Sequence, residues 1–315
     1  EAAYAVAREK CDVKTGDNKT ACVKEAQAKE ARAKRRIGLG MTGLADTLAM
    51  CGLRYGSEAA ATAAGEWSAI LETSAYGMSA RLAAEKGAFP LFDAEKYLGG
   101  GHARNLPEPV RKAVAKSGLR NGLLTSIAPT GTISLFAGNV SSGIEPIFNV
   151  SYERKVRQAD NSRKTLRVDD YAARLWWSLK GRDEPLPEAC VTAGQLTPHE
   201  HLIMQAAVQK HIDSSISKTI NVPEDCGFDD FREVYSEAYE LGLKGCTTFR
   251  PNKITGSVLS ISSEAEGPIM EREAALGGFT YKLKWPESDH AIYITMNDII
   301  KDGRRRPFEI FINSK

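Results

Sequence analysis

The stretch that decides the fold is NGLLTSIAPTGTISLFAGNVSSGIEPIF, residues 121–148. Leu123 to Ala128 is an apolar run with the length of a buried parallel strand. It continues into Pro129-Thr130-Gly131-Thr132-Ile133-Ser134, after which Leu135 and Phe136 resume an apolar pattern. This order predicts a strand, a tight turn and the first residues of a helix.

The turn at residues 129–134 has the composition of an anion-binding site. The first amides of a helix lack partners within the helix, and the positive end of its dipole favours a phosphate. Gly131 lets the backbone approach a ligand, and hydroxyl donors are added by Thr130, Thr132 and Ser134. No lysine follows the glycine, so the turn is not the GxxxxGKS/T loop of nucleotide triphosphatases. Taken alone, the spacing is equally consistent with ordinary helix capping.

The composition describes a globular chain without a dominant charge. Its 315 residues can bury a large core in one or two domains. With 42 Lys and Arg against 40 Asp and Glu, the net charge of +2 argues against general attraction to nucleic acid or membranes. No apolar run has the length of a membrane span, and no signal peptide is recognised. We therefore expect a cytoplasmic protein.

The six cysteines are scattered, without a CxxC pair. This usage fits a reducing compartment and neither a disulfide scaffold nor a zinc site. Cys11 and Cys22 bracket a polar insert between two helix-favouring stretches. We expect two small residues near an exposed helical hairpin, with a disulfide between them as the alternative.

Strand and helix patterns alternate along most of the chain. Helices are predicted at 57–86, 107–116, 169–180 and 228–241, and strands at 123–128, 147–156, 218–222 and 244–249. This alternation implies parallel βα units with helices outside, and ligands bind at the carboxyl ends of such strands. Thr197-Pro198-His199-Glu200 has the sequence of a helix start. His199 and His201 lie two residues apart, so we expect exposed histidines and no metal site.

The pattern changes after Pro251. Residues 254–268 are rich in Ser, Glu and Gly and predict a linker. Three later stretches alternate as half-buried antiparallel strands do, with a basic turn at 303–306; they are 281–285, 291–296 and 307–312. We expect a helical lead-in (1–34), an α/β body (35–253), the linker (254–268) and a β-rich segment (269–315). Both ends look cut, as in part of a longer chain.

Beyond the turn, several stretches in the same order resemble the large catalytic chain of ribonucleotide reductases. They are residues 35–46, 128–146, 218–223 (KTINVP) and 244–250 (KGCTTFR). The tail at 278–315 is similar to the adenosylcobalamin-dependent branch. The resemblance implies an α/β fold, namely the C-terminal half of a ten-stranded α/β barrel with long helices outside, followed by a small antiparallel β segment. It also implies that the substrate diphosphate is held by Pro129, Thr130, Gly131, Thr132, Ile133 and Ser134.

The resemblance further implies a chemistry and its missing parts. Ribonucleotide reductases replace the ribose 2′-OH with hydrogen through a cysteine thiyl radical, and two further cysteines supply electrons. The Asn-x-Cys-x-Glu-type loop that carries this radical is absent here, so no catalytic residue and no metal ligand is expected in this chain. The implied partners are a ribonucleoside diphosphate, an external dithiol such as thioredoxin, and adenosylcobalamin. A homodimer stays open, and nothing implies nucleic acid or a membrane.

Thr247 and Thr248 indicate the branch of the family. Reductases that import the radical from a separate subunit carry two adjacent tyrosines at this place, and threonine cannot form a phenoxyl radical. The threonines also suit a buried strand as ordinary β-formers, as Cys246 suits a small core position. Two alternatives stay open, namely the branch with a separate radical-generating subunit and a non-catalytic nucleotide-binding or interaction protein derived from the fold.

Overall fold

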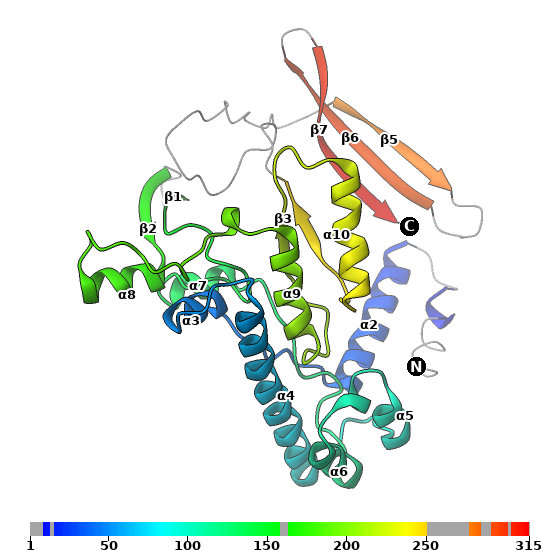
Figure 1. Ribbon diagram of the computed structural model, residues 1–315. Coiled ribbons are helices and arrows are strands. Elements are labelled where there is room, and N and C mark those ends of the chain that lie inside the picture. Colours follow the sequence, from blue (N-terminus) through cyan, green and yellow to red (C-terminus); the bar gives the residue numbers. More distant parts are fainter. Residues whose placement is uncertain are drawn as a thin grey trace. The chain divides into compact units, whose positions relative to one another are not determined.

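The structure is a computed structural model that describes residues 9–12, 16–157, 163–250, 277–284, 291–301 and 304–314. The chain divides into two compact units, residues 1–263 and 264–315. The first unit is mainly helical (Figure 1). Its helices are α2 (Gly16–Lys34), α3 (Leu44–Met50), α4 (Glu58–Lys86), α5 (Ala94–Gly99), α6 (Glu108–Ser117), α7 (Gly131–Phe136), α8 (Tyr171–Lys180), α9 (Pro198–Gln209) and α10 (Phe228–Glu240), with short 3-10 turns η1 (Ala103–Asn105) and η2 (Ala193–Gln195).

The helix boundaries follow local capping signals. Ser57 accepts a hydrogen bond from the amide of Ala60 at the start of α4, and Gly87 ends that helix with a φ of 79°. Thr197 and Glu200 form the reciprocal capping box of α9. The predicted helices at 57–86, 107–116 and 228–241 are confirmed to within one residue at each end. The helix predicted from residue 169 begins at residue 171, because the Asp170 side chain caps it.

Helix α4 organises the core of the first unit. It packs against α9 and α6, as Figure 1 shows. One apolar cluster joins its N-terminal half to α3 and α9, and includes Leu48, Tyr55, Met204 and Val208. A second joins its C-terminal half to α6 and the segment before α7, and includes Tyr76, Phe89, Val110, Leu119 and Leu124. Each fully buried side chain of this size contributes about 1.5–3 kcal/mol.

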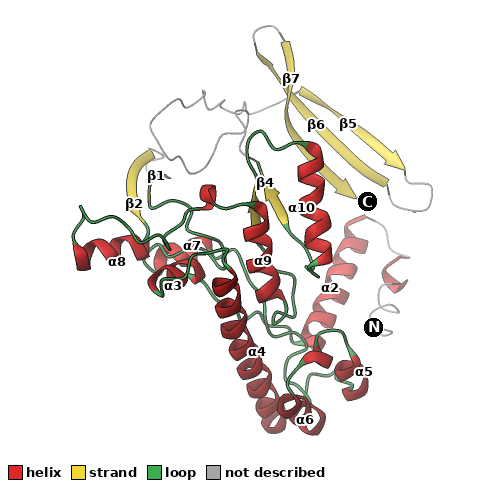
Figure 2. Cartoon of the chain, viewed as in Figure 1, coloured by secondary structure: helices red, strands yellow, loops and turns green. Residues whose placement is uncertain are grey.

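The strands of the first unit are few and short (Figure 2). β3 (Thr219–Asn221) pairs in parallel with β4 (Thr247–Phe249), which confirms the parallel orientation predicted for these segments. Single parallel bridges join Leu39 to Thr125 and Ile147 to Thr192. No closed barrel is formed by the residues that the structure describes.

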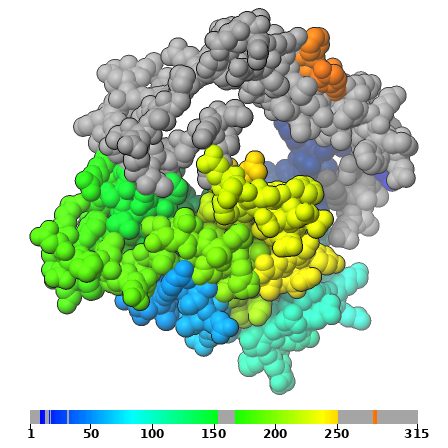
Figure 3. Space-filling model, turned by 45° about the horizontal axis from the view of Figure 1, so that its top comes forward, coloured from blue at the N-terminus to red at the C-terminus, as the bar shows by residue number. Residues whose placement is uncertain are grey.

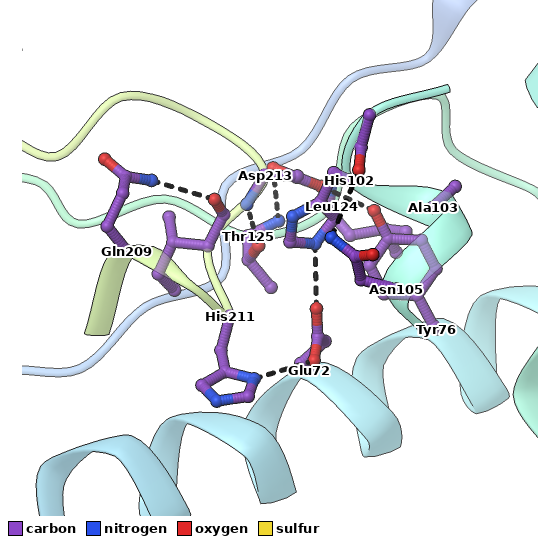
Figure 4. Close-up of polar contacts among 12 residues, drawn as sticks. Glu72, Tyr76, His102, Ala103, Asn105, Leu124, Thr125, Gln209, His211 and Asp213 are labelled. Carbon is purple, nitrogen blue, oxygen red and sulfur yellow. Dashed lines mark hydrogen bonds and ion pairs between the residues drawn. The ribbon is translucent and has the colours of Figure 1, made fainter. Parts of the chain in front are cut away.

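The prediction of a regular strand at 123–128 is wrong, because this segment forms only a single β-bridge. The segments on either side of it explain why. On one side it bonds to the chain at 37–39, through the amides of Ile37 and Leu39. On the other side the amides of Leu124 and Thr125 donate to the carboxylate of Asp213, at 2.7 and 3.1 Å (Figure 4). A side chain therefore replaces the carbonyls of a neighbouring strand, and only a bridge remains.

A second difference concerns residues 147–169. β1 (Ser151–Arg157) and β2 (Arg163–Asp169) form an antiparallel hairpin, with Ser151 opposite Asp169. The strand predicted from residue 147 therefore begins four residues later, and its partner at 163–169 was not predicted. The two strands are held by their own antiparallel pairing, which the βα alternation of the sequence does not predict.

The expectation of two unlinked small residues at Cys11 and Cys22 is wrong, and the alternative of a disulfide is confirmed. The two cysteines form a disulfide, with their Cα atoms 5.5 Å apart. The structure has helical residues at 9–12, and α2 begins at Gly16, which adopts a left-handed φ of 55°. The Cα separation lies within the usual range for a disulfide.

Helix α10 lies at the surface of the first unit (yellow in Figure 3). Val234 and Ala238 pack inward with Leu202 and Ile220. Phe228 and Tyr239 are exposed instead. In the described part of the chain, no helix combines the length and the apolarity needed to cross a membrane.

The second unit is an antiparallel sheet. β5 (Gly277–Lys284), β6 (Ala291–Lys301) and β7 (Arg304–Ser314) lie in that order, with Thr280 opposite Thr295 and Thr295 opposite Phe311. The antiparallel strands predicted from the alternating pattern are confirmed. The basic turn predicted at 303–306 is wrong in its extent, since Arg304, Arg305 and Arg306 are already paired residues of β7. The predicted linker at 254–268 lies outside the described residues.

Candidate functional site

A cavity of about 400 Å³ opens beside the turn at residues 129–134. Its walls come from the start of α7, the loop that follows it, β1, β3 and the start of α8. The polar lining is contributed by Ser134, Asn139, Ser141, Ser142, Glu145, Asn149, Tyr152, Asp170, Thr219 and Asn221. The volume lies within the range for small organic ligands, and the lining offers hydrogen-bond donors and acceptors on several sides.

The turn itself is open to solvent. Gly131, Thr132 and Ile133 are exposed, with Ile133 at 60%. The amides of these three residues have no hydrogen-bond partner among the described residues, as expected for the first turn of a helix. A Cβ placed on Gly131 would meet nothing within 4 Å, so the space over its backbone is free.

Thr130 holds the turn in an unusual conformation. Its φ of 50° lies in the left-handed region, which is costly for a β-branched residue. Its hydroxyl accepts the amide of Gly143 at 2.7 Å and contacts the hydroxyl of Thr42 at 2.9 Å. Thr130 therefore ties α7 to the chain before α3 and gives its own helix no side-chain cap.

The six predicted site residues take different positions. Gly131 and Ser134 line the cavity. Ser134 is buried, and its hydroxyl donates to the carbonyl of Gly131 and contacts Ser142 at 3.0 Å. Thr130 points to Thr42, and the exposed Pro129, Thr132 and Ile133 lie outside the cavity lining. The hydroxyls of Thr130 and Ser134 thus stabilise the turn, and the free donors are main-chain amides.

Two buried carboxyl groups, Asp46 and the cavity-lining Asp170, support the wall of the cavity. Asp46 of α3 accepts the amide of Ser141 at 2.6 Å and the amide of Ala172 at 3.0 Å, which joins the loop after α7 to α8. Asp170 is 4% exposed and accepts the amide of Ala173. Burial, with a smaller contribution from the charge of Asp46, raises the pKa of Asp170 to about 7.

A buried lysine holds a second carboxylate of the cavity wall. The ammonium of Lys218 donates to Glu145 Oε2 at 2.9 Å, to His201 Nδ1 at 3.0 Å and to the carbonyl of Thr219 at 3.1 Å. Its side chain is inaccessible to solvent, whereas that of Glu145 is 25% exposed. Glu145 Oε1 accepts the amide of Thr219 at 2.7 Å. The cation therefore fixes a carboxylate that faces the cavity.

The histidine expectation is half right. His199 is exposed and forms an ion pair with Glu237. His201 is fully buried, so the expectation of an exposed side chain is wrong there. Burial and the neighbouring charge of Lys218 lower its pKa to about 3, so the neutral ring accepts a hydrogen bond from the lysine. Residues two apart on a helix lie on different faces, so α9 places one histidine in solvent and the other in the core. The spacing alone did not show which of the two would be buried.

Lys218 and Glu145, which meet at the wall of the cavity, were not singled out from the sequence. The one available signal is a charge beside apolar residues, since Lys218 begins the predicted strand at 218–222 and Glu145 stands in GIEPIF. A charged residue in a predicted buried strand needs a partner of opposite charge. That partner lies 73 residues away.

A second polar cluster lies at α4 and does not line the cavity (Figure 4). Glu72 bridges His102 and His211, at 2.8 and 2.9 Å, and so joins α4 to the segments before η1 and after α9. Nearby, the hydroxyl of Tyr76 donates to Asp213 at 3.1 Å. Across the described residues, no group of three or more His, Cys, Asp or Glu side chains has the arrangement of a metal site.

Two of the free cysteines have environments that disfavour the thiolate. Burial raises the pKa of the Cys190 thiol, and the charges of Asp170 and Asp46 raise it further. Burial also raises the pKa of Cys246, which packs beside Leu243 and Cys226 against the cluster under α10. Cys246 is thus a small, partly buried residue, as predicted.

The comparison with known families identifies this arrangement. Residues 17–249 match the family model described as the ribonucleotide reductase barrel domain. The match spans the helical framework, the turn at 129–134, the cavity and the β3–β4 pair. The chain belongs to the ribonucleotide reductase family.

The similar proteins are vitamin B12-dependent reductases. The chain is 37% identical over 257 residues to the vitamin B12-dependent ribonucleoside-diphosphate reductase of Mycobacterium tuberculosis, covering 75% of this chain and 34% of that protein. It is 30% identical over 255 residues to the enzyme of the same name from Thermoplasma acidophilum, covering 76% and 31%. The chain thus spans about a third of the length of the curated relatives that it matches.

Proposed function

We propose that this chain is the substrate-diphosphate wall of an adenosylcobalamin-dependent ribonucleoside-diphosphate reductase. The observation that carries the proposal is the exposed turn at 129–134, where three unpartnered amides stand beside a polar cavity. Such amides bind the oxygens of a diphosphate without any lysine. The strained backbone of Thr130 supports a ligand-binding role, because strain of this kind is concentrated at binding sites.

The residues of this chain would bind and orient the substrate. The amides of Gly131, Thr132 and Ile133 would donate to the diphosphate, and Thr130 and Ser134 would hold the turn in place. Adenosylcobalamin supplies a carbon radical when its cobalt–carbon bond breaks. A cavity of 400 Å³ is far too small for a corrin ring, so we assign no residue here to the cofactor and derive no step through it.

The described strands would form part of a larger barrel. Two segments of the parallel pairings carry exposed apolar side chains. Ile37 and Leu39 belong to the segment that pairs with Thr125, and Phe249 belongs to β4. Unpaired strand edges with apolar side chains require a covering segment. We place that segment, together with the thiyl-radical loop, elsewhere in the full-length protein. The external dithiol, a homodimer and a cytoplasmic location complete the proposal.

Replacing Gly131 by valine tests the diphosphate site. The structure has room for the side chain, so the variant should fold, while the new methyl groups would occupy the space of the ligand. We expect the full-length Gly131→Val variant to lose at least tenfold in affinity for a ribonucleoside diphosphate, measured by calorimetry. Gly77→Val is the control for folding, since its Cβ also meets nothing within 4 Å. Unchanged affinity in Gly131→Val would remove the phosphate role.

A further inference from the structure

The two partners of the ion pair between Lys218 and Glu145 differ in burial, since only Glu145 is accessible to solvent. All three donors of the ammonium are engaged, by Glu145, His201 and the carbonyl of Thr219. The ring of Tyr55 lies 5.8 Å from the same nitrogen, and its hydroxyl is bound to the carbonyl of Ile144 at 2.6 Å. Lys218 is therefore enclosed and has no donor left for a ligand.

Glu145 is in the opposite situation. Each of its carboxylate oxygens accepts one hydrogen bond from the protein, one from Lys218 and one from the amide of Thr219. A carboxylate oxygen can accept two, so acceptor capacity remains on the side that lines the cavity. Because both protein bonds fix the group in place, a ligand would meet it preorganised.

The position of Glu145 indicates which part of a ligand it would meet. Its amide donates to the carbonyl of Ser142 at 2.8 Å, and the hydroxyl of Ser142 touches Ser134 of the turn at 3.0 Å. A tight turn therefore places Glu145 close to Ser142, and Ser142 contacts the proposed diphosphate site. A carboxylate accepts hydrogen bonds from hydroxyl or amino groups and repels phosphate oxygens.

We propose that Glu145 binds hydrogen-bond donors of the nucleoside part of the substrate and that Lys218 is the positioning residue that fixes its carboxylate. The donors are sugar hydroxyls or a base amino group, which share this chemistry. The inference rests on the proposed function, since it places the nucleoside next to the diphosphate turn. The buried cation also offsets part of the charge of Glu145, which weakens the repulsion between its carboxylate and the neighbouring diphosphate.

The test replaces both charges together. Removing one partner would leave an unpaired buried charge, whereas an apolar pair of similar volume is tolerated. In the full-length protein, E145M/K218M should bind inorganic pyrophosphate as the wild type does. It should bind a ribonucleoside diphosphate about tenfold more weakly, a change of about 1.4 kcal/mol. Calorimetry with both ligands gives the ratio of affinities, which a general loss of structure would not change selectively.

Two further variants control this test. E30M/K34M removes a partly exposed ion pair in α2 that does not line the cavity, and it should leave both affinities unchanged. If E145M/K218M does not fold, as judged by circular dichroism, E145Q/K218M preserves the side-chain shapes. Its amide keeps one acceptor oxygen, so the expected loss for the nucleoside diphosphate is about threefold. A 2′,3′-dideoxynucleoside diphosphate distinguishes hydroxyl from amino donors, because only hydroxyl recognition is lost with it.

The outcomes separate the two proposals. Wild-type protein that binds neither pyrophosphate nor the nucleoside diphosphate overturns the diphosphate site itself. Wild-type protein that binds both, with the same affinities in the folded double variant, overturns only the role of Glu145. Equal affinity of the wild type for pyrophosphate and the nucleoside diphosphate also overturns it, since the nucleoside would then add nothing.

Discussion

Asp170 is a single residue whose protonation should be visible in the stability of the protein. Its pKa is raised from 3.8 to about 7, first by burial and then by the charge of Asp46. Between these two values the folded state keeps a proton that the unfolded chain releases. The unfolding free energy therefore falls as the pH rises from about 4 to about 7, by up to about 4 kcal/mol.

The variant Asp170→Asn should remove this dependence. Asparagine also caps helices, so the bond to Ala173 can be kept while the titration is lost. We expect urea melts of Asp170→Asn to show a much flatter stability profile between pH 5 and pH 8 than the wild type. Asp93→Asn is the matched control, because Asp93 caps α5 in an exposed place where hydrogen bonding lowers its pKa. Identical slopes in Asp170→Asn and wild type would contradict the assignment.

Single residues also show what a sequence can indicate. The free amides near Gly131 follow from a turn whose composition is local, and Gly131 and Ser134 line the cavity, while the binding of a diphosphate there stays a prediction. Burial of His201 and Lys218 could not be read locally, because it depends on α9 packing over β3 and on Glu145 arriving from a distant loop. Thr130 was expected to donate to a ligand, and its contacts with Thr42 and Gly143 were equally out of reach.

At the scale of elements, helices were predicted better than strands. The ends of α4 and α9 are set by Ser57, Gly87 and Thr197, whose capping bonds span a few residues. The segment at 123–128 has the composition of a strand, but its pairing depends on what lies beside it. There the carboxylate of Asp213 takes the place of a strand, which no local pattern reveals.

Asp213 should therefore be essential for joining the segment at 123–125 to the end of α9. Asp213→Ala removes the acceptor of two backbone amides and of the Tyr76 hydroxyl. Leaving partly buried donors unpaired costs about 1–3 kcal/mol each, so we expect a loss of about 3 kcal/mol in urea melts. Asp183→Ala, at an exposed position, should change stability by less than about 0.5 kcal/mol. A loss below 1 kcal/mol in Asp213→Ala would mean that water or a neighbouring carbonyl replaces the carboxylate.

At the scale of the whole molecule, the family was recognised from ordered motifs, while the closed barrel was not found. The described residues contain only β3–β4 and two bridges as parallel pairings. A barrel is closed by contacts between segments far apart in sequence, and this chain spans about a third of its relatives. The remaining strands and the radical loop would have to come from the rest of the full-length protein.

The side chains on and beside β4 bear on the source of the radical in the full-length protein. On β4, Thr247 and Thr248 have no phenol group that could carry a radical. The hydroxyl of Tyr235 on α10, however, lies 3.1 Å from the hydroxyl of Thr248. If a radical entered along this strand, Tyr235 would be the nearest carrier. If it arises within the barrel from adenosylcobalamin, Tyr235 only hydrogen-bonds to Thr248.

We therefore expect reduction of ribonucleoside diphosphates to require added adenosylcobalamin and a dithiol, and to need no second subunit. Tyr235→Phe should retain activity within about twofold, and Tyr239→Phe, which is exposed on the same helix, serves as its control. Activity without the cofactor, or its loss in Tyr235→Phe alone with folding intact, would favour the branch that imports its radical.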